Sequence, residues 1–164
     1  MPARKHKPTK PASVEPQRVL FSWLGLADCG RALRGLQDSG ELTKAEADTI
    51  LHSDRYEGSS AKDLAEGKLE VLLGQHSFVE VHVLTELGEA AAKVFRSWMS
   101  RQGYDVIVHV VAVGNAYDYE EIYREVADEL QRYEQHPSSS SRRLAFFLNP
   151  GTRAMSAVWV LLSR

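Results

Sequence analysis

The chain has 164 residues, 43% of them apolar and 26% charged, and its formal net charge is −2. These values are typical of one ordinary globular domain. No apolar run approaches the roughly 18 residues of a membrane-spanning helix, and the N-terminus lacks the apolar region of a secretory signal. Cys29 is the only cysteine, which excludes a disulfide framework and a thiolate zinc site. We therefore expect a cytoplasmic protein with no membrane partner.

Residues 1–17 contain four prolines and almost no large apolar side chains, which predicts a disordered tail. Residues 1–18 hold five basic side chains against one glutamate, a net charge of +4, so the remainder carries −6. A net-negative body is not expected to hold a long nucleic-acid duplex, although it leaves room for a small anionic ligand in a local pocket. The tail could touch nucleic acid, but it has no aromatic residue to stack bases, which favours a role in solubility.

The first predicted element is an apolar, β-rich strand over residues 18–25, which ends at a glycine. A polar loop follows it, and then a short helix over 31–36. Thr43 and Glu46 match a capping box, which predicts a second short helix over 43–52.

The middle of the chain alternates between helix and strand. One helix is predicted to start at residues 60–63 and to carry several leucines. A strand over 78–84 follows, and then an amphipathic helix over 88–101 with a glycine C-cap at Gly103. The next strand, 104–113, is an almost continuous apolar run, as is typical of a parallel strand covered on both faces.

The periodicity over 118–135 predicts the clearest helix in the chain, because an apolar or aromatic residue recurs at helical spacing at Tyr119, Ile122, Tyr123, Val126, Leu130 and Tyr133. Asp118 is expected to be its N-cap. A flexible loop of Pro137 and four serines, a strand over 143–148 and a final helix complete the pattern. This alternation predicts an α/β fold over residues 18–164. We expect a Rossmann-like open, mainly parallel sheet of about four strands with helices on both faces and right-handed crossovers.

The most informative segment is residues 144–162, where a buried strand runs into a tight turn and then an apolar helix. Gly151 permits a positive φ or a close approach to a ligand, and Thr152 stands where a helix N-cap belongs. The first amides of such a helix lack intrahelical partners and carry partial positive charge. Because ligands of open α/β sheets bind at the carboxyl edge of the strands, this turn is the predicted anion site.

The final helix is apolar nearly all round, so we expect Trp159 or its neighbours to need a cover beyond the sheet. Either a partner subunit supplies that cover, or the chain is one portion of a longer unit.

Other chemistry-bearing residues form no known motif. The six histidines have no metal-ligand spacing, and Cys29 has no identifiable base beside it. Neither a GxGxxG nor a P-loop sequence is present, so no cofactor and no metal are expected.

Three segments resemble a known family: FSWLG at residues 21–25, GNAYDYEEIYREV at 114–126 and FFLNPGTRAMSAVWVLLS at 146–163. Through them, residues 18–164 resemble the CRISPR-associated Rossmann fold (CARF) sensors. The resemblance is closest to the RtcR-like N-terminal domain of sigma-54-dependent RNA-repair regulators. The chain has no counterpart of that family's fifth and sixth strands or of its effector domain, so we expect a truncated version of the fold.

The resemblance implies a homodimer that acts through a separate effector protein in antiviral defence or in transcription regulation of RNA repair. The ligand would be a small nucleotide, either a cyclic oligoadenylate or an RNA end such as a 2′,3′-cyclic phosphate. Two loops would hold it, through Ser22, Trp23, Gly25 and Asp28 after the first strand and Asn149, Gly151, Thr152 and Arg153 after the fourth.

Several of these residues also have a structural interpretation. Strand alternation puts one of Ser22 and Trp23 in the core, and Asp28 could cap the next helix instead of binding a ribose. Asn149 could bond a base edge or stabilise its turn. Arg153 could pair with phosphate or point to solvent, and its unfavourable charge at a helix N-terminus favours the ligand role. Asn115 follows the third strand at the same predicted edge and is a further candidate.

Three functions fit this sequence. The first is a non-enzymatic sensor that binds the ligand at the sheet edge near a dimer interface. The second is an interaction fragment of a larger regulator with no ligand. The third is a metal-independent ring nuclease that cleaves cyclic oligoadenylate, for which Ser22, Thr152 and Arg153 could contribute although no dedicated base is evident.

Overall fold

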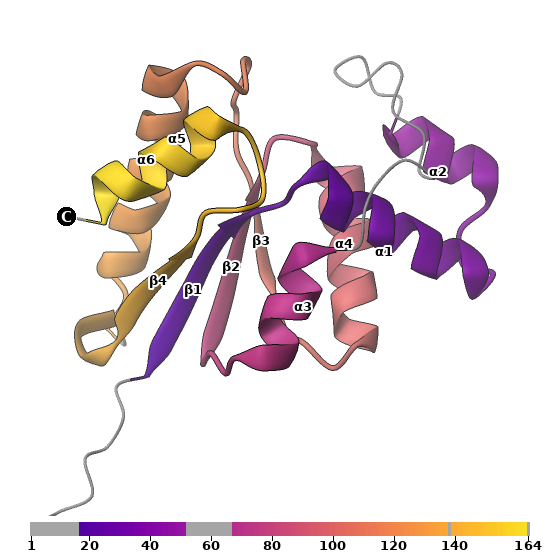
Figure 1. The fold of residues 1–164 in the computed structure, drawn as a ribbon, viewed down its shortest axis with the longest axis horizontal. Coiled ribbons are helices and arrows are strands. Elements are labelled where there is room, and N and C mark those ends of the chain that lie inside the picture. Colours follow the sequence, from indigo (N-terminus) through magenta and orange to yellow (C-terminus); the bar gives the residue numbers. More distant parts are fainter. Residues whose placement is uncertain (1–16, 52–66, 138, 164) are drawn as a thin grey trace, which may run out of the picture.

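A computed structural model of the chain describes residues 17–51, 67–137 and 139–163. Almost all of the predicted tail and the predicted helix start at 60–63 lie outside these residues. The sheet contains β1 (Arg18–Trp23), β2 (Glu80–Thr85), β3 (Ile107–Val110) and β4 (Arg143–Phe147). All pairings are parallel, and the spatial order is β3-β2-β1-β4 (Figure 1). The predicted α/β fold with a four-stranded parallel sheet is confirmed.

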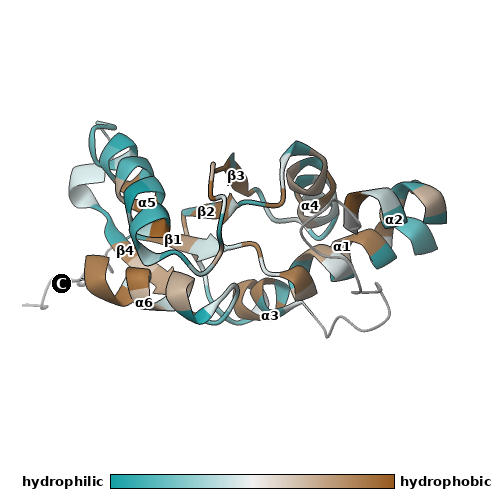
Figure 2. Ribbon diagram, turned by 90° about the horizontal axis from the view of Figure 1, so that it is seen from above, coloured by the Kyte–Doolittle hydropathy of each residue, from teal (hydrophilic) through white to brown (hydrophobic). Residues whose placement is uncertain are grey.

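Five of the six α-helices in the described residues cover the two faces of this sheet (Figures 1 and 2). One face carries α1 (Leu26–Asp38), α3 (Lys68–Gln75) and α4 (Glu89–Arg101), with α2 (Lys44–Leu51) packed on α1. The other carries α5 (Tyr119–Glu134) and α6 (Arg153–Leu162), which pack on each other. Figure 2 shows that their outer faces are hydrophilic along most of α5 but hydrophobic along much of α6.

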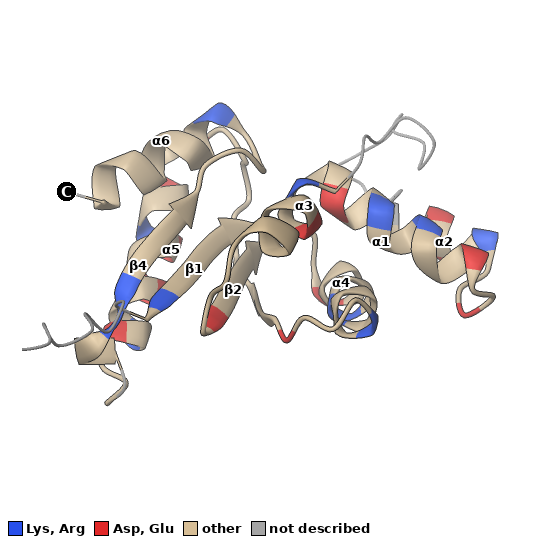
Figure 3. Cartoon of the chain, turned by 60° about the horizontal axis from the view of Figure 1, so that its bottom comes forward, with Lys and Arg blue, Asp and Glu red and all other residues tan. Residues whose placement is uncertain are grey.

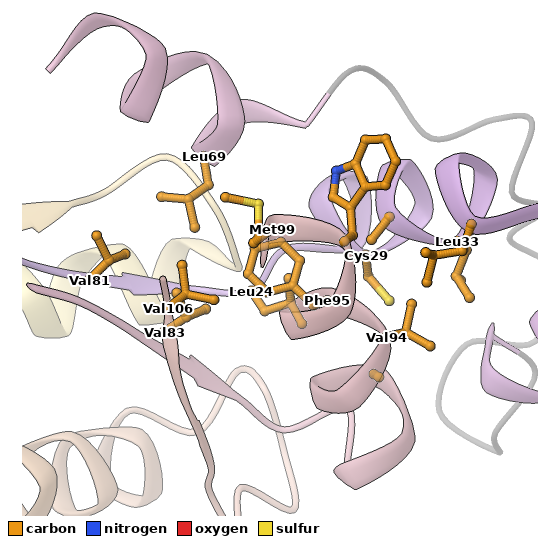
Figure 4. Close-up of a cluster of buried hydrophobic side chains, with 14 of the residues drawn as sticks. Leu24, Cys29, Leu33, Leu69, Val81, Val83, Val94, Phe95, Met99 and Val106 are labelled. Carbon is orange, nitrogen blue, oxygen red and sulfur yellow. The ribbon is translucent and has the colours of Figure 1, made fainter. Parts of the chain in front are cut away.

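Strand β1 is the centre of both apolar cores. Its side chains alternate between the faces, so Leu20 joins the core under α1 and α4, whereas Phe21 and Trp23 join the core under α5 and α6. Figure 4 shows the first of these cores, in which side chains from the sheet meet Phe95 and Met99 of α4. An apolar strand of this kind is stable only when both faces of the sheet are covered, as in parallel α/β folds.

The connections between strands change from one face of the sheet to the other once along the chain, and this change determines where a pocket can form. The connections from β1 to β2 and from β2 to β3 cross the α1/α4 face, whereas α5 returns the chain to β4 on the opposite face. Neighbouring strands β1 and β4 are therefore followed by helices on opposite sides of the sheet. Such a point, where the strand order reverses, opens a crevice at the carboxyl edge.

Several local sequence signals are confirmed. The Thr43 backbone N–H donates to the Glu46 carboxylate at 2.8 Å, and the Glu46 N–H donates to the Thr43 hydroxyl at 3.2 Å, so the predicted capping box exists. Asp118 caps α5 by accepting from the amides of Glu120 and Glu121.

Two expectations about local structure are wrong. Helix α1 begins at Leu26, directly after the extended Gly25, so the polar segment predicted as a loop is helical. β3 is only four residues long and half exposed, because it lies at the sheet edge and not inside the sheet. The predicted serine loop contains one 3-10 turn, η1 (Ser139–Ser141), shortly before β4.

Charged side chains are dispersed over the surface. Figure 3 shows Lys and Arg on α1, α2, α4 and α6 and at the starts of β1 and β4, with acidic residues between them. No helix within the described ranges combines the length and hydropathy that crossing a bilayer requires.

Helices α1 and α4 approach closely at one glycine. A Cβ added at Gly35 would lie 2.0 Å from the Trp98 ring. Since Trp98 is buried, the ring has little room to move. The absence of a side chain at Gly35 is therefore what allows the two helices to pack.

We expect Gly35→Ala to lower the free energy of unfolding by about 1 to 3 kcal/mol, because the methyl overpacks a rigid contact. Gly74→Ala is the matched control: its Cβ would meet only the Tyr104 hydroxyl at 3.7 Å, so improved helix propensity should leave stability unchanged or slightly higher. Urea denaturation followed by circular dichroism measures both. Equal effects of the two variants would contradict the packing argument.

Candidate functional site

A pocket of about 830 Å³ opens at the carboxyl edge of the sheet. Loops that follow all four strands line it, with residues 24–26 after β1, 86–87 after β2, 114–117 and 119 after β3, and 151–154 after β4. The pocket thus occupies the place that the switch between β1 and β4 predicts. Its volume lies within the usual range for small-molecule sites, roughly 300 to 1,000 Å³.

The turns after β1 and β4 touch each other beneath the pocket. A Cβ at Gly25 would lie 3.3 Å from the Pro150 Cβ and 3.4 Å from the Gly151 nitrogen, so the glycine lets the two backbones come together. Gly151 has φ of +90°, and a Cβ there would also lie 2.7 Å from the Met155 sulfur. The predicted positive φ at Gly151 is confirmed, and only glycine adopts it here without strain.

Thr152 joins two walls of the pocket. It is the N-cap of α6, as expected, and its hydroxyl accepts from the Met155 amide at 3.3 Å. The same hydroxyl donates to the Ala116 carbonyl on the β3–α5 loop at 2.6 Å. The one donor of this hydroxyl and one of its two lone pairs are therefore used within the protein, which makes Thr152 a structural link more than a free ligand group.

The backbone of the β3–α5 loop is held by one carboxylate, that of Glu121. The amides of Gly114 and Asn115 donate to Glu121 at 2.7 and 3.0 Å, and these bonds lower the pKa of that carboxyl. The Asn115 side chain then accepts from the Tyr117 amide at 3.0 Å. The loop is thus fixed in one shape before any ligand arrives, and Asn115 lies in the pocket wall as a turn-forming residue.

The charged groups in the pocket lining are Arg153 and Glu86. Arg153 is the first residue of α6, where the helix end carries partial positive charge, and it is exposed. Glu86 stands on the β2–α4 loop. A ligand that fits this lining has an anionic part near the α6 terminus and hydrogen-bond donors where Glu86 can accept them.

Ser22 and Trp23 do not reach this pocket. Both are fully buried, so the expectation that one of them would point outward is wrong. The reason is that helices cover both faces of β1. Ser22 donates to the Trp23 carbonyl, and the Trp23 ring packs near the Trp159 ring with centroids 6.3 Å apart.

Asp28 and Asn149 also lie outside the pocket lining. Asp28 is a buried residue of α1, not of a loop, and its carboxylate accepts from the Leu69 amide at 2.8 Å. It therefore does cap a helix, but this is α3 from across the fold and not the helix next in sequence. Asn149 accepts from the Lys68 ammonium at 3.1 Å, which ties the β4–α6 turn to α3.

The pocket therefore gathers five of the nine predicted site residues: Gly25, Asn115, Gly151, Thr152 and Arg153. Sequence reasoning missed Glu86, Tyr117 and Tyr119. Both tyrosines follow β3 next to Asn115, which was selected, but helical periodicity had assigned Tyr119 to a packing face. The available signal was two aromatic side chains directly after a strand, at the edge where ligands bind.

Trp159 is fully buried against Phe146 and Phe21, so it needs no further cover. Its neighbours Val160 and Leu161 are exposed, and so is Leu148, which follows β4.

Two of the histidines meet in space. His82 and His109 lie on adjacent strands with their ring nitrogens 3.0 Å apart, and each contacts a carboxylate, Glu80 or Glu129. Burial is the main cause that lowers the pKa of both rings. Within residues 17–51, 67–137 and 139–163, no group of three or more His, Cys, Asp or Glu side chains is arranged to hold a metal ion.

Cys29 is buried in α1, and burial raises the pKa of its thiol to about 12. The thiol therefore stays protonated at neutral pH and cannot act as a nucleophile in the folded chain.

Comparison with known proteins found no matching family model and no significant match among curated proteins. What this chain does must therefore be inferred from its own geometry.

Burial raises the pKa of the Asp28 carboxyl from 3.8 to about 6, against the opposing effect of the Leu69 and Lys68 amides. Since the folded-state pKa exceeds the unfolded one, the fold loses stability as the pH rises from about 4 through 6. Asn keeps the acceptor for Leu69 without the charge. We expect Asp28→Asn to stabilise the protein at pH 7.5, by at most about 3 kcal/mol, and to lose most of this gain at pH 4.5.

Urea denaturation at the two pH values tests this expectation. Asp105→Asn is the control for the loss of one carboxylate, because Asp105 is exposed and lies outside the core. If Asp28→Asn instead destabilises the protein at pH 7.5, the negative charge of Asp28, and not only its hydrogen bond to the Leu69 amide of α3, stabilises the fold.

Proposed function

We propose that the chain is a ligand-sensing regulatory protein that binds a small nucleotide or an RNA-end phosphate in the pocket at the carboxyl edge of its sheet. The observation that carries this proposal is the pocket of about 830 Å³ whose lining includes the N-terminal turn of α6 and Arg153. A helix N-terminus with an adjacent arginine favours an anion, and a fork of guanidinium donors matches phosphate.

Glu86 limits which anions fit. A carboxylate in the same lining repels a ligand that is anionic throughout, but it accepts hydrogen bonds from ribose hydroxyls or base amino groups. A nucleotide combines both kinds of group in one small molecule. The sequence resemblance to CARF sensors leads to the same ligand class, with a cyclic oligoadenylate or a 2′,3′-cyclic-phosphate RNA end as the specific candidates.

The pocket favours binding over cleavage. Among the described residues, its lining contains no histidine, cysteine or lysine, and the Thr152 hydroxyl already donates at 2.6 Å to a backbone carbonyl. Glu86 is the carboxylate among the described lining residues that could act as a base. Ring cleavage therefore remains the alternative activity, and a product assay decides between the two.

We expect candidate ligands to raise the melting temperature and to bind in calorimetry, and we expect Arg153→Gln to weaken binding by about 10- to 100-fold. Charge-assisted hydrogen bonds of this kind are worth about 1.5 to 3 kcal/mol. Arg96→Gln is the control, because Arg96 is an exposed arginine of α4 outside the pocket. The screen uses cyclic oligoadenylates and RNA oligomers with 2′,3′-cyclic-phosphate ends.

Absence of binding by every ligand, or equal effects of the two arginine variants, would contradict the proposal and leave an interaction fragment as the better account. Linear products from cyclic oligoadenylate in the same samples would indicate the ring nuclease instead.

The proposed sensor is a homodimer that passes its state to a separate effector protein. Support comes from α6, whose Val160 and Leu161 side chains are 42% and 55% exposed, and from Leu148 beside the edge strand β4. A ligand can shift a dimer between two arrangements only if it binds one of them better. An interface on α6 could make ligand binding depend on the dimer arrangement, because the first turn of the same helix lines the pocket.

We expect Leu161→Glu to convert a dimer into monomers, since it places a charge in the apolar patch of α6. Val71→Glu is the control, because Val71 is a similarly exposed apolar residue on α3, on the opposite face of the sheet. Light scattering coupled to size-exclusion chromatography at several concentrations measures the mass. A wild-type protein that is monomeric at all concentrations would contradict the dimer.

A further inference from the structure

Two tyrosines stand in the pocket with most of their surface uncovered. Tyr117 is 73% exposed and Tyr119 is 54% exposed, and both belong to the pocket lining. Neither ring is a member of the two apolar cores. Aromatic side chains bring the most stabilisation when they are buried, so two exposed rings that share one pocket contribute little to this fold.

The backbone that carries these rings is fixed on three sides. Glu121 accepts from two amides of the loop, Asp118 caps the start of α5, and the Thr152 hydroxyl holds the Ala116 carbonyl from the opposite wall. Tyr117 lies between two of these anchored residues. A ring on a backbone that is ordered in advance loses little conformational entropy when a flat ligand settles on it.

The same pocket contains the anion-binding end of α6. Arg153 begins α6, Tyr117 lies on the β3–α5 loop and Tyr119 begins α5. All three line one continuous space of about 830 Å³. A ligand that uses Arg153 and the tyrosine rings has a negative group at one end and a flat aromatic group at the other. Among small biological anions, nucleotides have this combination, and base-free sugar phosphates and inorganic phosphate do not.

From this arrangement, and building on the function proposed above, we infer that Tyr117 and Tyr119 form a stacking platform for an unpaired nucleobase. The ligand class is thereby narrowed to nucleotides with an accessible base. Stacking on aromatic side chains is tolerant of base identity, because every base has a π-face. The two tyrosines would therefore add affinity for any nucleobase, whereas selectivity between bases would depend on hydrogen-bonding groups such as the Glu86 carboxylate.

The test uses two probes, adenosine 2′,3′-cyclic phosphate and the base-free ribose 5-phosphate, with calorimetry on the full chain. Tyr117→Ala and Tyr119→Ala should each weaken the binding of adenosine 2′,3′-cyclic phosphate by about 5- to 100-fold, as expected from the loss of stacking on one base. They should leave the affinity for ribose 5-phosphate unchanged. Tyr117→Phe keeps the ring and should stay within about twofold of the wild type.

Tyr123→Ala is the matched control, because Tyr123 is an exposed tyrosine of α5 that does not line the pocket. If both probes bind equally well, and Arg153→Gln weakens them while the tyrosine variants do not, the stacking platform is overturned and the anion site stands. If neither probe binds the wild type, and the larger ligands of the screen do not bind either, the proposed function fails and this inference fails with it.

Discussion

The burial of β1 on both faces is the constraint from which the rest of the structure follows. Phe21 and Trp23 face α5 and α6, whereas Leu20 faces α1 and α4, so helices must cover both sides of the strand. The chain meets this demand by changing faces between β3 and β4. That single change separates α1 from α6 beside neighbouring strands, and the pocket opens between them. Core formation and pocket formation are thus two results of one topological requirement.

Signals that act within a few residues could be read from the sequence. The Thr43–Glu46 capping box, the Asp118 N-cap and the strand–turn–helix around Gly151 all depend on neighbours in the chain, and each was predicted. Contacts across the fold could not be read in this way. The burial of Asp28 under α3 and the pairing of His82 with His109 depend on which elements become neighbours.

The candidate site residues also divide into those that local sequence signals identify and those that depend on packing across the fold. Gly25, Gly151 and Thr152 were identifiable because a turn at the strand edge needs those residue types locally. Ser22 and Trp23 were misplaced because strand alternation was taken to leave one of them facing outward, whereas the helices expected on both faces of the sheet leave neither side of β1 exposed. Tyr119 was missed for the opposite reason. Helical periodicity assigned its ring to a packing face, and only the packed structure shows that Tyr119 remains outside the core.

The hydrogen bond from the Thr152 hydroxyl to the Ala116 carbonyl joins the β3–α5 loop, which carries Tyr117, to the start of α6. Displacing either alone would break this bond, at a cost of about 1 to 3 kcal/mol if the carbonyl is left without a partner. The ten residues of α6 then span about 15 Å from this anchored end to the exposed Val160 and Leu161. Because Val158 and Trp159 are fully buried, the far part of α6 is fixed to the sheet as well, so pocket and apolar patch belong to one firmly packed helix.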